Sequence, residues 1–231
     1  MLKVPMKSLL LALFFVVLLN PVRSAPTETE VGAMIAELQS PQAKVRVRAA
    51  DRVQQLAEIP EALVPVLFDM VINVRRTGEP LEDLIGLTAV HFADLALAKC
   101  GRRIVPQLRE YMRNPATRWT AVGILKRIGS DAGDAVPELI VALGDKNRNV
   151  VSLALYTLEA VGPRAAPAVD DLIALLRDKD DDNREKAIQV LGGLGQAAAK
   201  AIPYLKKLSK HEGSLDSSYA AEAIDKIEKA R

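Results

Sequence analysis

The fold is decided by the stretch RIGSDAGDAVPELIVAL, residues 127–143, because two related stretches follow it at a constant interval. Residues 160–176 read AVGPRAAPAVDDLIALL, and residues 193–209 read GLGQAAAKAIPYLKKLS. Matched glycines in these stretches stand 33 residues apart, at Gly129, Gly162 and Gly195. A fixed period with matched apolar and glycine positions indicates an array of structural repeats.

Each period has the apolar spacing of two helices. The second half of one period carries an apolar stripe at helical spacing, formed by Ala154, Leu155, Leu158 and Val161. The first half of another carries a second stripe, formed by Val136, Leu139, Ile140 and Leu143. Pro137 fits the first turn of that helix, where a missing N–H costs little. The glycine after each second helix fits a C-cap, where positive φ is favoured.

Weaker copies of the pattern occur before residue 127, so that six helix pairs are predicted in all. Their approximate ranges are 28–57, 61–100, 103–128, 133–161, 165–194 and 198–230, with an insertion at 75–83 in the second pair. One pair cannot bury its own apolar stripe, so neighbouring pairs must stack and share a core. We therefore expect an all-α fold, namely a right-handed α-solenoid of about six antiparallel helix pairs.

The repeat resembles a known family. The motif VRVRAA at residues 45–50 and the Leu-x-x-Ile-Gly ending at residues 125–129 resemble HEAT repeats. More narrowly, they are similar to the short HEAT-like repeats of phycobilin lyases. The resemblance covers nearly all of residues 25–231 and implies an ARM-type superhelix. It carries no activity over to this chain, because many non-enzymes share the repeat.

The resemblance also implies a ladder of ion pairs between repeats. In HEAT arrays, an Asp in the turn stacks with an Arg at the start of the second helix. The residues that match these positions are Arg46, Arg118, Asp145, Asp178 and Arg184. Val90 and Val151 stand where two further arginines are expected, and Ser40 and Met112 replace two of the Asp residues. The predicted ladder is therefore partial.

The N-terminus has the pattern of a secretory signal peptide. Lys3 and Lys7 precede an apolar run at residues 9–19, and small residues follow around Ser24. An uncleaved membrane anchor is the alternative, but eleven apolar residues are fewer than the roughly 20 that span a bilayer. We expect residues 1–24 to be a signal peptide and residues 25–231 a single HEAT-like domain. The protein would then be exported to a periplasmic or extracellular location.

The charge balance argues against nucleic acid as a partner. Residues 1–24 hold three basic residues and no acid, so that 28 basic and 29 acidic residues remain, a net charge of −1. Without a basic field, we expect neither nucleic-acid binding nor membrane binding after signal cleavage. The single cysteine, Cys100, aligns with apolar core positions, which predicts a buried thiol.

Residues that could carry chemistry are scarce. His91 and Asp94 are three positions apart on one predicted helix, but no nucleophile motif accompanies them. The acidic run DKDDDN at residues 178–183 lacks the glycine and distal Glu of a calcium loop and fits helix capping better. The run GGLGQ at residues 192–196 is not a phosphate-binding loop; its glycines favour close helix approach over a ligand space. We expect no catalytic residue, no metal and no cofactor.

A binding surface is easier to predict than a reaction centre. One face of the second helices lies beside the core stripe at about 100° per residue. The predicted partner-binding residues on this face are His91, Trp119, Lys126, Tyr156, Glu159 and Gln189. Aromatic side chains with a polar edge concentrate binding energy at interfaces. Alternatively, Trp119 and Tyr156 only cover the gaps between repeats.

These observations predict an exported, non-catalytic scaffold that binds another protein through the concave helix face. The identity of the partner and the oligomeric state do not follow from the sequence. The alternative is a lyase-like or ligand-binding protein that acts on or carries a small molecule in the concavity. A closed pocket around His91, Asp94 and Trp119 would favour this alternative, and an open groove would favour the scaffold.

Overall fold

The computed structural model describes residues 25–76, 84–178, 180–210 and 215–230. The predicted signal peptide and most of the predicted insertion, residues 77–83, lie outside the described residues. The described chain forms six pairs of antiparallel helices and contains no strand. The first helices of the pairs are α2 (Glu28–Leu38), α4 (Val64–Arg76), α6 (Val105–Arg113), α8 (Val136–Leu143), α10 (Val169–Leu175) and α12 (Ile202–Leu208). The second helices are α3 (Ala43–Gln54), α5 (Leu84–Lys99), α7 (Pro115–Ile128), α9 (Arg148–Val161), α11 (Asp181–Gly193) and α13 (Leu215–Lys229).

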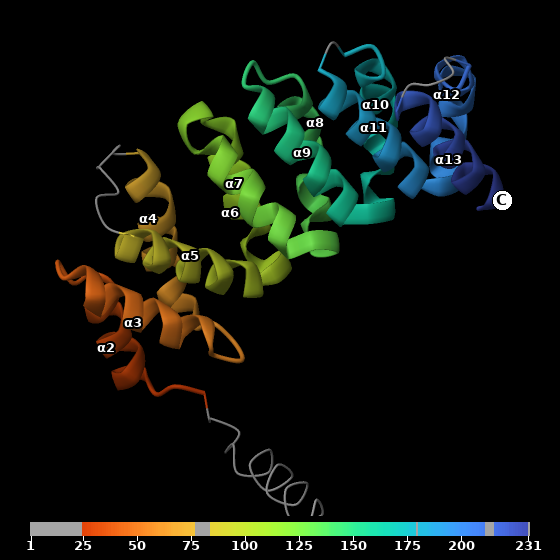
Figure 1. The fold of residues 1–231 in the computed structure, drawn as a ribbon. Coiled ribbons are helices and arrows are strands. Elements are labelled where there is room, and N and C mark those ends of the chain that lie inside the picture. The colour runs from red at the N-terminus through yellow and green to blue at the C-terminus, as the bar shows by residue number, and fades with distance from the viewer. Residues whose placement is uncertain (1–24, 77–83, 179, 211–214, 231) are drawn as a thin grey trace, which may run out of the picture.

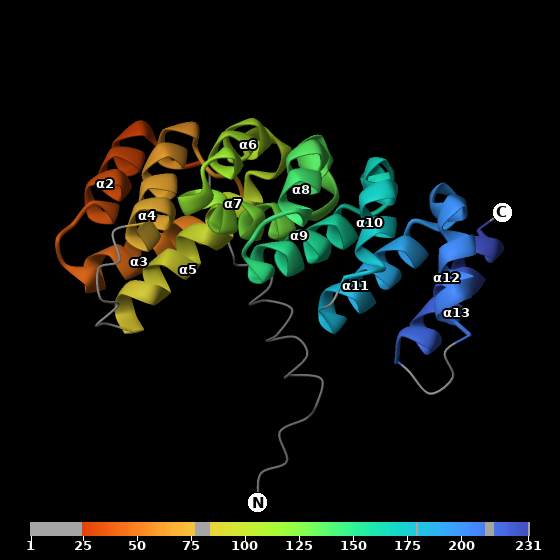
Figure 2. The same ribbon diagram turned by 90° about the horizontal axis from the view of Figure 1, so that it is seen from above.

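The pairs stack side by side into a curved array (Figure 1). Figure 2 shows the first helices along the outer side of the curve and the second helices along its inner side. Each second helix packs directly against the next one, from α3 and α5 to α11 and α13. The all-α solenoid predicted from the repeat is confirmed, and the inner, concave face belongs to the second helices.

Each connection between consecutive pairs contains a 3₁₀-helix, and in the first connection turns and bends at residues 55–60 precede it. These segments are η1 (Glu61–Leu63), η2 (Gly101–Ile104), η3 (Gly129–Ala135), η4 (Gly162–Ala168) and η5 (Gly195–Ala201). The predicted α-helical starts near residues 133, 165 and 198 were therefore three to four residues early. Four of the segments begin with a glycine at φ between 54° and 70°, which confirms the predicted C-caps.

The core is continuous along the array and consists mostly of small and aliphatic side chains. Ala121, Ala154 and Ala187 occupy equivalent positions on three second helices, and each is fully buried. Small residues at these positions let helix backbones approach closely. One close approach involves Gly192, where an added Cβ would lie 3.0 Å from Ala223 Cα. Cys100 differs from the prediction, because it lies at the end of α5 and is only half-buried.

Side-chain caps begin the second helices in the middle of the array. The side chains of Asn114, Asn147 and Asp180 each accept a hydrogen bond from a backbone N–H in the first turn of α7, α9 and α11. Asp180 Oδ1 accepts from Asn183 N at 3.0 Å. The predicted capping role of the acidic run is thus confirmed at Asp180.

Ion pairs connect the turns of neighbouring repeats. Arg118 pairs with Asp145 of the next repeat, and Arg184 Nε pairs with Asp216 Oδ2 at 2.5 Å. Each of these arginines also donates to a carbonyl of its own turn, at Met112 and Asp178. The guanidinium therefore connects two repeats through charge-assisted hydrogen bonds.

The ladder has one arginine that the alignment missed. Arg148 Nη1 donates to both carboxylate oxygens of Asp178, at 2.8 and 2.7 Å. Arg148 is one helical turn before Val151, the aligned position, and its long side chain still reaches the Asp of the next turn. At the N-terminal end, Arg46 donates to the carbonyls of Ser40 and Pro41 within its own turn.

Candidate functional site

The middle of the concave face carries a cluster of aromatic and charged side chains from three successive second helices. Tyr156 on α9 is 41% exposed. Lys126 Nζ from α7 lies 4.8 Å from the centroid of its ring, and Lys186 Nζ from α11 lies 4.3 Å from the same centroid. Two ammonium groups therefore share one aromatic ring, and the cation–π contacts hold it across the gaps between helices.

The charge of Lys186 is balanced by Glu159, which lies on the same helix as Tyr156. Lys186 Nζ pairs with Glu159 Oε2 at 2.5 Å and donates to Gln189 Oε1 at 3.3 Å. Its side chain is only 11% exposed. A long cationic side chain that is this covered needs charge and hydrogen-bond partners. Lys186 therefore organises Tyr156, Glu159 and Gln189 into one polar layer.

The structure brings together four of the six predicted partner-binding residues. Tyr156, Glu159 and Gln189 contact Lys186, and Lys126 contacts the same Tyr156 ring. The sequence pattern missed Lys186 because it lies one position beyond the chosen face. One sequence signal could have found it: Lys186 occupies the repeat position of Leu153 and Thr120, which are largely buried, so a covered charge would be expected there.

The other two predicted residues lie farther toward the N-terminus. Trp119 is on α7, two turns before Lys126, and is 43% exposed. His91 is exposed on α5, and its nearest aromatic neighbour is Phe92, with ring centroids 6.0 Å apart. Asp94, on the same helix, is buried and accepts a 2.9 Å hydrogen bond from Arg127 Nε of the next repeat. The carboxylate of Asp94 thus serves a contact between repeats.

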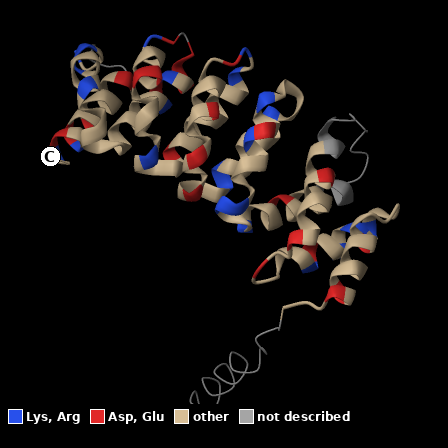
Figure 3. Ribbon diagram, turned by 180° about the vertical axis from the view of Figure 1, so that it is seen from behind, with Lys and Arg blue, Asp and Glu red and all other residues tan. Residues whose placement is uncertain are grey.

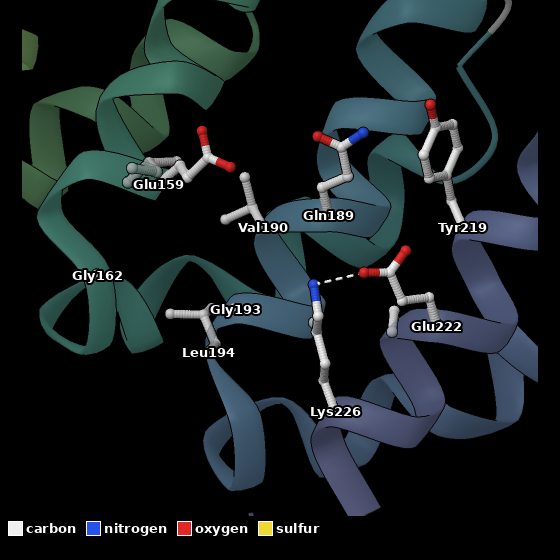
Figure 4. Close-up of a pocket in the computed structure, with 12 residues that line it drawn as sticks. Glu159, Gly162, Gln189, Val190, Gly193, Leu194, Tyr219, Glu222 and Lys226 are labelled. Carbon is white, nitrogen blue, oxygen red and sulfur yellow. Dashed lines mark ion pairs between the residues drawn. The ribbon is translucent and has the colours of Figure 1, made fainter.

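A pocket of about 380 Å³ adjoins the cluster on the C-terminal side, between α9, α11 and α13. Gly192 and Gly193 line it together with the apolar side chains of Leu158 on α9, Val190 on α11 and Leu194 directly after α11. Figure 4 shows Glu159 on one side of the pocket and Glu222 on the other, with Gln189 at its rim. The sequence did not predict this pocket. One of its walls comes from α13, whose position in the array the repeat pattern indicated only weakly.

The charge on the pocket walls is mixed. Glu222 Oε1 pairs with Lys226 Nζ at 2.7 Å within α13, and Tyr219 is on the same helix one turn earlier. Glu159 pairs with Lys186, which is not itself part of the lining. The lining therefore contains two carboxylates and one ammonium group, and Lys186 beside the lining balances the charge of Glu159.

The N-terminal end of α11 is also acidic. Burial raises the pKa of the Glu185 carboxyl, and the nearby carboxylates of Asp216, Asp182 and Asp181 raise it further. Along the array as a whole, basic and acidic residues are interspersed (Figure 3). In the part of the chain that the structure describes, no three His, Cys, Asp or Glu residues are placed to hold a metal ion. None of the described helices combines the length and apolarity that a membrane span requires.

Comparisons with known proteins bear on the fold. No family model and no curated protein sequence matches the chain. An engineered protein of known structure is similar over 87% of this chain and 97% of its own, at 19% identity and a TM-score of 0.52. A computationally designed armadillo repeat protein for modular peptide recognition covers 84% of this chain and 98% of its own, at 16% identity and a TM-score of 0.49.

The complex of CpcE and CpcF of phycocyanin lyase from Nostoc sp. PCC7120 matches 90% of this chain and 98% of its own, at 23% identity and a TM-score of 0.38. At such identities, structural likeness shows only a shared fold. The match with a TM-score of 0.52 supports the fold alone: the chain is an α-solenoid of helix-pair repeats, as its sequence predicts.

Proposed function

We propose that this protein is a non-catalytic scaffold that binds another protein through its concave face. The observation that carries the proposal is the exposure of Trp119 and Tyr156 on adjacent second helices, at 43% and 41%. Large aromatic side chains exposed on a preorganised surface are the residues that anchor partner proteins. Tyr156 is held by two lysines from neighbouring helices, so ordering it on binding costs little entropy.

The N-terminal pattern supports a location outside the cytoplasm. Under this proposal, residues 1–24 direct export and are removed, and the scaffold works in a periplasmic or extracellular space. The mature chain would then have a net charge of −1, which fits a protein partner better than a nucleic acid.

A second function, binding of a small molecule in the concavity, is favoured by the pocket between α9, α11 and α13. The sequence-based version of this alternative placed the ligand around His91, Asp94 and Trp119. That location is disfavoured because the carboxylate of Asp94 accepts a hydrogen bond from Arg127 of the next repeat. Asp94 therefore serves the packing of the repeats and does not face a ligand as an acceptor or a general base.

Affinity capture from the native compartment, followed by mass spectrometry, tests the scaffold function. We expect one protein to be recovered reproducibly with the wild type and lost with the Trp119→Ala/Tyr156→Ala variant. Tyr204→Ala is the matched control, since Tyr204 is 40% exposed on α12 in the outer layer. Its capture should equal that of the wild type.

Thermal unfolding of the same variants separates binding from packing. The double variant should keep a thermal midpoint within a few degrees of the wild type, because exposed side chains contribute little to stability. A large loss of stability would indicate that the two aromatics cover gaps between repeats. A partner that is retained by the double variant would contradict the proposed binding face.

A further inference from the structure

We infer that the pocket between α9, α11 and α13 receives a basic side chain, preferably an arginine, from the bound partner. This inference rests on the proposed function and adds the chemistry that the partner must offer. It concerns Gly193, Glu222 and Lys226, which lie outside the set of residues predicted to bind from the sequence.

The shape of the pocket fits a long side chain with a polar end. A Cβ added at Gly193 would find nothing within 4 Å, so the absence of a side chain there leaves open space. Val190 and Leu194 add apolar surface to the lining. The aliphatic part of an arginine or lysine buries itself favourably along such a surface while its charged end stays at a polar rim.

One carboxylate of the lining, Glu222, can receive a cation from a partner in place of its present neighbour Lys226. Glu159 and Glu222 approach from opposite sides (Figure 4), and Lys226 is the single ammonium group in the lining. Glu159 is held by the covered Lys186, whereas Glu222 and Lys226 are 60% and 55% exposed, so their ion pair is weak and exchangeable. A guanidinium can donate to a carboxylate through two parallel hydrogen bonds, which a lysine ammonium cannot do.

The neighbouring polar groups complete the recognition of a guanidinium. Tyr219 offers a hydroxyl that can accept a hydrogen bond and an aromatic ring, while the amide oxygen of Gln189 at the rim already accepts from Lys186. The arrangement combines acceptors, an aromatic ring and apolar lining in one cavity. These are the features that a basic side chain needs when it leaves water.

Selection from a random peptide display library tests the inference. The wild-type protein should enrich peptides that share one arginine or lysine. Gly193→Leu should lose this enrichment, because the leucine fills the pocket. Gly32→Leu is the control, since Gly32 is also helical and exposed, with nothing within 4 Å of an added Cβ. It should enrich the same basic peptides as the wild type.

Binding measurements with the best enriched peptide make the test quantitative. Replacing its arginine by citrulline, which keeps the shape and removes the charge, should weaken binding at least about tenfold. Glu222→Gln should weaken binding of the arginine peptide and leave binding of the citrulline peptide unchanged. Equal losses for both peptides would contradict recognition of the charge.

The outcomes distinguish this inference from the proposed function. Enriched peptides without a basic residue, or basic peptides that still bind Gly193→Leu, would overturn the inference and leave the scaffold function standing. A library that yields no binding peptide would contradict both. If agmatine, a free guanidinium compound, binds as tightly as the arginine peptide, then the pocket serves a small amine and the assignment to a partner side chain is wrong.

Discussion

The ion pair between Arg184 and Asp216 should be a major source of stability in the C-terminal half. Both side chains are mostly covered, at 18% and 14% exposure, and Arg184 also donates to the Asp178 carbonyl at 2.8 Å. Asp216 Oδ1 is buried without a hydrogen-bond partner among the described residues. Arg184→Met would therefore leave a covered carboxylate uncompensated, which costs about 3 kcal/mol.

Urea unfolding followed by circular dichroism would measure this loss. The control is Arg113→Met, because Arg113 pairs with Glu110 at 2.7 Å while both side chains are over 60% exposed. That variant should lose no more than about 0.5 kcal/mol. The reasoning is refuted if Arg184→Met loses no more than its control, since the ladder would then contribute nothing beyond a surface ion pair.

Four further substitutions have effects whose sign follows from the local surroundings of one residue. The pKa of Asp145 is lowered by the Asn147 N–H and by Arg118, so its stabilisation is present above the unfolded pKa of about 3.9 and is lost as the pH falls through the folded value. The stability difference between the wild type and Asp145→Asn, measured by urea unfolding from pH 7 to pH 3, should shrink below about pH 4. Glu185 has a raised pKa, so its charge is unfavourable in the folded state; Glu185→Gln should stabilise the protein at pH 7, and the gain should vanish near pH 4. Gly192→Ala should lower the thermal midpoint, because the added methyl group would collide with Ala223 on α13. Gly193→Ala should raise the midpoint slightly, because nothing lies within 4 Å of its added Cβ and the helix propensity of alanine contributes about 0.5 kcal/mol. Equal effects of the two substitutions would contradict the packing described.

The periodic features of the sequence predicted the fold well, because each has a local physical cause. A glycine at the end of a second helix marks a backbone position of positive φ, and its recurrence fixes the register of the whole array. The 3₁₀-helices after these glycines were missed, because their alanine-rich segments have no periodicity that distinguishes them from the following α-helix.

The candidate site was less predictable, since it depends on contacts between repeats that differ from one another. Lys186 and Arg148 each lie off the aligned position, and the length of their side chains lets them reach partners that the alignment assigns elsewhere. The pocket requires Gly193 on one helix and Glu222 on the next, and no spacing rule joins them. The contacts of charged residues with long side chains are therefore the part of the site that the repeat pattern does not predict.

Helix α11 links the stability of the array to the proposed pocket. Its first turn is fixed to α13 by Arg184 and Asp216, and near its other end Gly192 packs against Ala223. Because both ends are anchored, the two pocket walls keep their spacing before a ligand arrives, and little ordering cost remains on binding. Arg184→Met should therefore lower the affinity for the arginine peptide several-fold, measured at a temperature where the variant is fully folded, although Arg184 does not line the pocket. Arg113→Met should leave the affinity unchanged; an unchanged affinity in Arg184→Met as well would show that the pocket does not depend on the ladder.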